Sequence, residues 1–138
     1  MRKTCTIIAA SALALALLPA TASATPGSGV TGTILAKKTI GHTDYTLREI
    51  TVQPGGYTGW HFHDGTLYAY VKSGTLTHNL ADCSIDGVFG TGRAFTEKPD
   101  QVHIGRNLGS TPLVLEVLYV LPAGSPLSED APDPGCGF

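Results

Sequence analysis

The sequence has few charged residues and few cysteines. Charged residues make up only 14% of the 138 positions, and the nine lysines and arginines, outnumbered by eleven acidic residues, gather in no basic patch. A protein that binds nucleic acid needs such a patch to neutralise the phosphates. We therefore expect no nucleic-acid partner.

Long hydrophobic runs are missing too, apart from one near the N-terminus. Residues 7–18 are apolar, follow Arg2 and Lys3, and precede a small-residue segment that ends at Ala24. This order is typical of a secretory signal peptide, and the run is shorter than the roughly 20 residues of a membrane span. We expect residues 1–24 to direct Sec-type secretion and to be removed, which leaves no membrane attachment.

The predicted mature chain, residues 25–138, has two cysteines. Of the three cysteines in the sequence, Cys5 belongs to the signal segment, which leaves Cys83 and Cys136. An even pair in an exported protein favours a disulfide. The alternative is a thiol site, although neither cysteine belongs to a Cys-x-x-Cys motif.

The mature chain shows no convincing helical period. Short apolar runs alternate with glycine and proline turn signals, which predicts an all-β protein, either a sandwich or a barrel. The segments "TLYAYVK" and "TLTHNL" flank "SG" as a tight hairpin. Residues 113–121 are almost continuously apolar, so we expect them to be buried on both faces. We predict one domain of this kind over residues 25–121.

The C-terminal segment differs from the rest in composition. Residues 122–138 hold four prolines, which cannot donate to a strand ladder. We expect an irregular tail that packs on the barrel surface and is held near Cys136.

Two histidines, His61 and His63, are the strongest candidates for chemistry. Side chains two positions apart in a strand point the same way, so the two imidazoles share a face. Neutral imidazole is a preferred ligand for transition metals. A His-x-His pair is weak support alone, but His103 follows in another predicted strand, "QVHIGRN".

The spacing around these histidines resembles the two conserved motifs of the cupin superfamily. The first motif is matched by Gly55, His61, His63 and Gly74. The second is matched by Gly92, Pro99, His103 and Asn107, with one residue fewer between the proline and the histidine. The resemblance covers roughly residues 47–121.

The resemblance implies a cupin jelly-roll β-barrel, also called a double-stranded β-helix. His61, His63 and His103 would bind one divalent metal ion in the barrel mouth, and three imidazoles suit Zn, Cu, Mn, Ni or Fe. The glutamate of the first motif is missing, because Leu67 and Tyr68 stand at its two allowed positions. The chain thus resembles the three-histidine cupins, among them thiol dioxygenases and diketone-cleaving enzymes.

Four further residues are candidates for the pocket. Asp64 follows the second histidine and could turn back as a ligand or cap the loop. Glu116 is a carboxylate inside an apolar run, where it is costly unless paired, either with Arg93 or Arg106 or near the metal. Tyr68 and Tyr70 either line the pocket or pack. We expect His42 and His78 at the surface, Trp60 in the core, and Asn107 in a turn-stabilising role.

Three functions fit these features. The first is a metal-dependent enzyme, a dioxygenase or a lyase or isomerase, acting on a small chelating molecule. The second is a non-catalytic extracellular binder of a metal or a small ligand. The third is a structural cupin with vestigial histidines, against which the presence of all three histidines counts. Cupins often dimerise through strand edges, so the resemblance also allows a homodimer.

Overall fold

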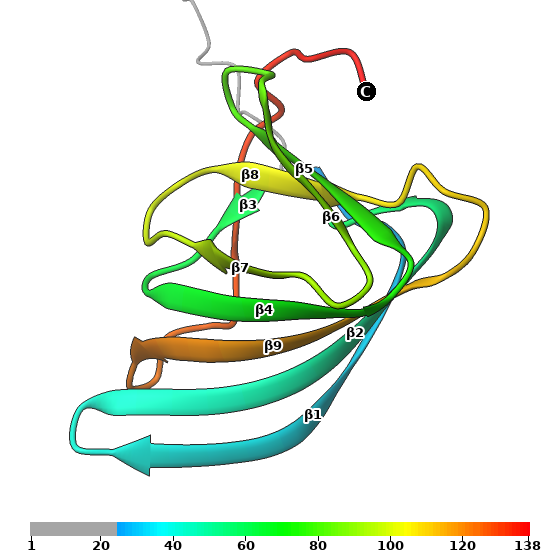
Figure 1. Ribbon diagram of the computed structural model, residues 1–138. Helices are drawn as coiled ribbons and strands as arrows, with labels where there is room; N and C mark the ends of the chain where they lie inside the picture. The colour runs from blue at the N-terminus through cyan, green and yellow to red at the C-terminus, as the bar shows by residue number, and fades with distance from the viewer. Residues whose placement is uncertain (1–24) are drawn as a thin grey trace, which may run out of the picture.

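The computed structural model describes residues 25–138, so the predicted signal peptide lies outside the described residues. Ten antiparallel strands form one sheet that curls over on itself into a nearly closed barrel (Figure 1). This confirms the predicted all-β class. In the described part of the chain, no helix is long and apolar enough to cross a membrane.

The ten strands are β1 (Ser28–Ile40), β2 (Thr43–Tyr57), β3 (His61–Phe62), β4 (Thr66–Ser73), β5 (Thr75–Leu80), β6 (Ile85–Gly90), β7 (Ala94–Glu97), β8 (His103–Arg106), β9 (Leu113–Pro122) and β10 (Glu129–Asp130). The long strands β1, β2, β9 and β4 lie side by side, and β3, β8, β5 and β6 lie across the barrel from them (Figure 1).

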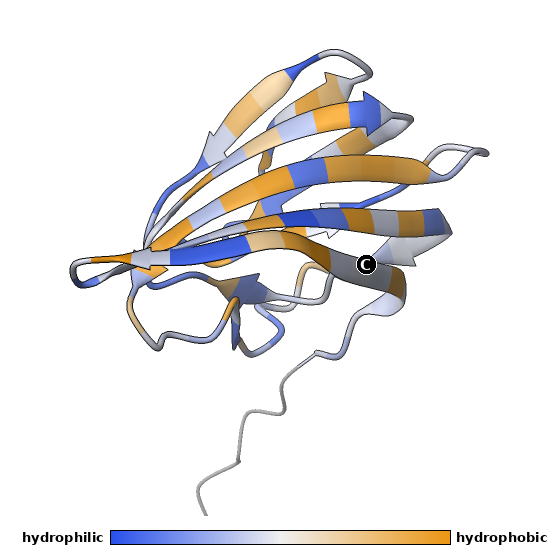
Figure 2. Ribbon diagram, turned by 90° about the horizontal axis from the view of Figure 1, so that it is seen from below, coloured by the Kyte–Doolittle hydropathy of each residue, from blue (hydrophilic) through white to orange (hydrophobic). Residues whose placement is uncertain are grey.

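Alternation along the strands decides which side chains enter the barrel. In β4, Leu67, Ala69 and Val71 are buried while Tyr68 and Tyr70 are exposed. The same two-residue period is visible as bands of different hydropathy along the strands (Figure 2). The inward side chains of β2, β4 and β9 form the main apolar core.

The central strand β9 departs from the sequence prediction. Its odd-numbered residues are buried, but its even-numbered residues from Val114 to Val120 are only half-buried. The prediction that residues 113–121 are buried on both faces was therefore wrong. The reason is that β9 pairs antiparallel with β2 and β4, and an antiparallel sheet can leave one face toward solvent.

Gly74 and Asn107 stabilise turns that connect the strands of the barrel. Gly74 joins β4 to β5 with a φ of +80°, and a Cβ there would collide with the backbone of β9. The buried side chain of Asn107 donates from Nδ2 to the carbonyls of Val52 (2.9 Å) and Thr111 (2.8 Å). It thus has the turn-stabilising contacts that the sequence suggested.

The C-terminal tail is an integral part of the barrel wall. Its strand β10 pairs with β3, and the amide of Ala131 donates to the carbonyl of Trp60 at 2.9 Å. The structure contains the disulfide between Cys83 and Cys136, which ties the tail to the loop between β5 and β6. The tail is irregular elsewhere, but proline content alone did not reveal β10, because its two residues lie between the prolines.

Candidate metal centre

The three predicted imidazoles meet on the inner side of the barrel. His61 in β3 lies opposite His103 in β8 in the sheet register, and His63 follows β3 directly. The ring centroids of His61 and His103 are 4.3 Å apart, and those of His63 and His103 are 5.2 Å apart. One nitrogen of each ring lies within 4.8 Å of the other two, close enough for the three to share one ion.

Each of these rings is oriented through its Nδ1 atom by a backbone carbonyl. The pairs are His61 with Gly59 at 2.9 Å, His63 with Leu127 at 2.7 Å, and His103 with Gln101 at 2.7 Å. A carbonyl oxygen can only accept, so the proton of each neutral ring sits on Nδ1 and the Nε2 atom carries a free lone pair. Such contacts orient histidine ligands in metal sites.

A carboxylate that sequence reasoning missed, Glu97, extends toward the three rings. It ends β7, and its Oε2 atom lies 3.2 Å from Nε2 of His63 and 3.5 Å from Nε2 of His103. Its side chain is 12% exposed. Glu97 thus places a carboxylate beside the rings, although positions 67 and 68 have none. Its only sequence signal was its place two residues after the apolar Phe95, on the same face of a strand.

A fourth histidine, His78 in β5, joins the group. It was expected at the surface, but its side chain is only 2% exposed, because β5 pairs with both β6 and β8. Its Nδ1 atom lies 3.1 Å from a carboxylate oxygen of Asp86, and its Nε2 atom lies 3.5 Å from Oε1 of Glu97. Local alternation gave no signal for this, because Leu76, Thr77, His78 and Asn79 are all buried.

The ligand-like atoms of this cluster are buried without hydrogen bonds. Nε2 atoms of His63, His78 and His103 have no hydrogen-bond partner among the described residues. A nitrogen lone pair that faces a carboxylate repels it unless a proton or a metal ion lies between the two, and unpaired buried polar atoms are costly. Imidazole nitrogen and carboxylate oxygen are donors for divalent transition metals. The residues present therefore fit a metal ion.

The protonation states also suit a metal. Burial, followed by the nearby rings of His103 and His63, lowers the pKa of His61 to about 3. Burial would raise the pKa of Glu97, but its contacts with His103, His63 and His78 together outweigh burial and hold that pKa well below its ordinary value. At neutral pH, His61 is a neutral donor and Glu97 an anion, as metal ligands must be.

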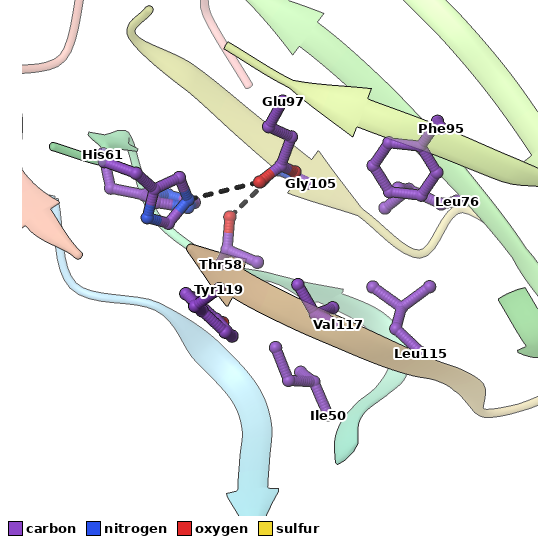
Figure 3. A pocket seen from close by; sticks show the side chains of 11 residues that line it. Ile50, Thr58, His61, Leu76, Phe95, Glu97, Gly105, Leu115, Val117 and Tyr119 are labelled. Atoms are coloured by element: carbon purple, nitrogen blue, oxygen red, sulfur yellow. Dashed lines mark hydrogen bonds and ion pairs between the residues drawn. The ribbon is translucent and has the colours of Figure 1, made fainter. Parts of the chain in front are cut away.

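Two cavities that share five lining residues adjoin the cluster. The inner one, about 40 Å³, has Glu97, Thr58 and the histidines at one end and the apolar Leu76 and Phe95 at the other (Figure 3). The outer one, about 110 Å³, shares His61, His63, Thr58, Ile50 and Tyr119 with it. Its other lining residues are Val30, Arg48, Ser128 and Asp130. These volumes suit a few waters or one small molecule.

The remaining predicted pocket residues lie elsewhere. Tyr68 and Tyr70 are 54% and 45% exposed, because strand alternation in β4 turns them away from the barrel interior. Glu116 is half-buried on the outer side of β9, where it pairs with Lys72 at 3.2 Å rather than with an arginine. Asp64 is half-buried after β3 and lines neither cavity. The structure does not bring these four side chains to the histidines.

Comparison with known proteins agrees with this architecture. The family model described as "Cupin domain" matches residues 48–121. No curated relative matches the sequence. Among solved structures, the polyketide cyclase RemF from Streptomyces resistomycificus is 20% identical with a TM-score of 0.60, and the match covers 88% of this chain and 90% of RemF.

Two further solved structures have the same fold. A cupin-2 domain protein from Rhodospirillum rubrum is 17% identical, with a TM-score of 0.61, over 75% of this chain and 66% of that one. KdgF from a Halomonas species is 20% identical, with a TM-score of 0.54, over 65% of this chain and 77% of KdgF. At these identities the likeness extends to the fold alone.

Proposed function

The chain belongs to the cupin family, and on that premise we propose that it is a secreted enzyme that binds one divalent metal ion and acts on a small chelating molecule. His61, His63 and His103 hold the ion, and Glu97 balances part of its charge and can complete its shell. When bound, the ion supplies Lewis-acid chemistry to ligand oxygens or, if it is redox-active, a centre for oxygen chemistry.

One observation carries this proposal: each of the three rings uses Nδ1 for a backbone carbonyl and turns Nε2 toward the others. A structural histidine cluster would pair these Nε2 atoms with donors. Here two of the three Nε2 atoms, those of His63 and His103, are buried and unpaired. The arrangement is therefore preorganised for a cation, which counts against vestigial histidines.

The chain's own residues provide the other parts of a reaction site. Glu97 is an anionic carboxylate that is 12% exposed, so it can accept a hydrogen bond from a bound molecule. Burial is the main cause that raises the pKa of Tyr119, so its phenol keeps its proton and can donate to a ligand oxygen. Phe95 and Leu76 provide an apolar wall at the inner end.

Two reaction types fit this site, a dioxygenase and a lyase or isomerase. The fold neighbour RemF carries the name of a polyketide cyclase, which supports an enzyme on this kind of barrel without fixing the reaction. Export in an unfolded state would let the protein acquire its metal outside the cytoplasm. Copper and zinc then have the advantage in affinity over manganese and iron.

A non-catalytic binder is the second candidate, and the size of the inner cavity favours it. About 40 Å³ leaves room for little more than an ion and its waters. In that case the barrel holds a metal, or a small metal-chelating molecule, without turning it over.

Metal content tests the shared part of both candidates. We expect elemental analysis of protein purified from culture medium to give about one divalent ion per chain. The double variant His61→Ala/His103→Ala should lose it, while His42→Ala, which alters an exposed histidine, should keep it. An equal metal content in the wild type and the double variant would overturn the proposal.

Turnover separates the enzyme from the binder. The metal-loaded protein should consume oxygen with a flavonol, a diketone or a small thiol, or convert a chelating acid without oxygen uptake. Activity should disappear in the double variant. If the loaded protein binds such molecules but leaves all of them unchanged, the binding function stands and the enzymatic one fails.

A further inference from the structure

A basic side chain, Arg48, lies on the inner face of β2 beside the metal centre. It follows the strand alternation between the buried residues Thr46 and Ile50 and is itself half-buried. Arg48 lines the outer cavity together with His61 and His63. The barrel thus presents a permanent positive charge to the same small space as two of the imidazoles.

The neighbouring strand makes room for this guanidinium at Gly32. A Cβ atom at Gly32 would overlap the Nε, Cζ and Nη2 atoms of Arg48, so the guanidinium lies directly over the glycine. Gly32 does not have a positive φ, so its backbone conformation does not require glycine. Glycine is needed at position 32 because the side chain of Arg48 fills the space that a Cβ atom would take.

Arg48 has no carboxylate partner within residues 25–138. The ion pairs of this range involve other cations. The two acidic residues that line the cavities, Asp130 at the outer one and Glu97 at the inner one, form no ion pair with it. The adjacent Tyr119 is a neutral phenol, because burial raises its pKa more than Arg48 lowers it.

We propose that Arg48 binds the carboxylate of a small organic acid in the outer cavity, with a second oxygen of the same acid turned toward His61 and His63. A planar guanidinium matches a carboxylate through two parallel hydrogen bonds. The second contact rests on the proposed function, since it needs the metal, whereas the Arg48 contact does not.

The cavity narrows the class of acid. Its volume of about 110 Å³ admits only a few non-hydrogen atoms. Asp130 on the same cavity repels a second carboxylate, which favours a monoacid. A 2-hydroxy or 2-oxo acid has a carboxylate and a neighbouring oxygen within this size, and it chelates divalent metals through the two.

Glycolate and its neutral analogue glycolamide are the probes that test Arg48. Each is titrated into zinc-loaded and metal-free protein while the Arg48 Nε–H resonance is followed by NMR. Glycolate should shift this resonance in both forms and bind the zinc form at least tenfold more tightly than glycolamide. Arg48→Gln should lower glycolate affinity at least tenfold and remove the preference, with zinc content unchanged.

Three further variants keep the test independent of folding. Arg48→Lys retains the charge without the paired donors and should bind with intermediate affinity. Asp130→Asn leaves Arg48 intact and should strengthen glycolate binding several-fold. Arg106→Gln is the matched control, since Arg106 packs 3.8 Å over the Phe138 ring outside the two cavities, and it should bind like the wild type.

The outcomes distinguish this inference from the proposed function. If zinc-loaded Arg48→Gln binds glycolate as tightly as the wild type, or glycolate leaves the Arg48 resonance unmoved in both forms, the role of Arg48 is overturned while the metal site stands. If the wild type retains no zinc but glycolate still shifts the resonance, the metal proposal fails and the anion site at Arg48 stands.

Discussion

At the scale of single residues, the metal centre depends on which ring nitrogen carries the proton. The carbonyls of Gly59, Leu127 and Gln101 hold the proton of each ring on Nδ1. The orienting groups are thus backbone atoms, which substitutions of the side chains at these three positions leave in place. Glu97 is the charged side chain that lies in direct contact with the rings of His63 and His103.

Replacement of Glu97 by glutamine tests its electrostatic role. Glu97→Gln keeps the shape but removes the negative charge, so metal affinity should fall roughly 10–100-fold. Competition with a chromophoric chelator measures this change. Glu116→Gln is the matched control, because that carboxylate pairs with Lys72 away from the site, and its affinity should equal that of the wild type. Equal affinities in both variants would show that Glu97 does not act on the metal.

Acid should destabilise the metal-free protein through His61. Its folded pKa of about 3 lies below the ordinary 6.5, so between these values the unfolded chain takes up a proton that the folded protein refuses. The free energy of unfolding should therefore decrease as the pH decreases through this window, by up to ~1.4 kcal/mol per pH unit for this group.

The lowered pKa of Glu97 adds to this effect in the same direction. Its stabilising contribution is present above the ordinary value of 4.5 and is lost as pH falls below it toward the lower folded pKa. Urea denaturation of metal-free protein from pH 7 to pH 4 measures the slope. His61→Leu should flatten it between pH 6.5 and 5, and an unchanged slope would contradict the assignment to His61.

Asn107 should matter for stability rather than for metal binding. Asn107→Ala leaves the buried carbonyl of Val52 without its donor and removes two further hydrogen bonds. We expect a loss of roughly 2–4 kcal/mol in the free energy of unfolding, measured by chemical denaturation. Ser110→Ala, an exposed position in the same loop, should cost almost nothing. A comparable loss in both variants would contradict the role of the Asn107 side chain.

At the scale of strands, the tail holds the site from outside. Strand β10 pairs with β3, the carbonyl of Leu127 orients His63, and the disulfide between Cys83 and Cys136 anchors the chain beyond them. Two of the three ring-orienting carbonyls are local to their histidines, whereas Leu127 lies 64 positions away from His63. The orientation of His63 therefore depends on the tail staying packed against the barrel.

Removal of the disulfide should loosen this contact. Cys83→Ser/Cys136→Ser should lower the free energy of unfolding by roughly 2–5 kcal/mol and weaken metal binding through the freed Leu127 carbonyl. Hydrogen exchange should increase first at the amides of residues 127–131. Ser84→Ala is the neighbouring control. If exchange in the tail is unchanged, the bond stabilises the chain without orienting His63.

Strand pairing explains which features the sequence predicted and which it did not. The β4–β5 hairpin followed from two short apolar segments and the "SG" turn between them. His61, His63 and His103 were found because the motif spacing survives in the chain. Glu97 and His78 were missed because their approach depends on the long-range pairing of β7 with β4 and of β5 with β8. No local pattern records such pairings.

At the scale of the whole molecule, the metal should act as a part of the fold. His61 and His63 at β3 and His103 in β8 come within reach of one ion. Such an ion would join strands whose ligands, His61 and His103, lie 42 positions apart in the sequence. An ion that binds only the folded state stabilises it by mass action.

Thermal unfolding measures this contribution. Zinc at a hundred times its dissociation constant should add ~2.7 kcal/mol and raise Tm by roughly 10 °C, as followed by calorimetry with and without chelator. His61→Ala/His103→Ala should show no zinc-dependent shift. A shift of the same size in the double variant would locate the zinc elsewhere on the protein.

The position of the Leu127 carbonyl shows that the end of the family match and the end of the structure that orients His63 are different boundaries. The recognisable domain ends at residue 121, six positions before that carbonyl. A recombinant fragment trimmed to the recognisable domain would retain all four histidines and Glu97, yet it would release the ring of His63 to rotate. Its weaker hold on metal would be an artefact of the trimming, so the shortest faithful version of this protein has to extend through Cys136.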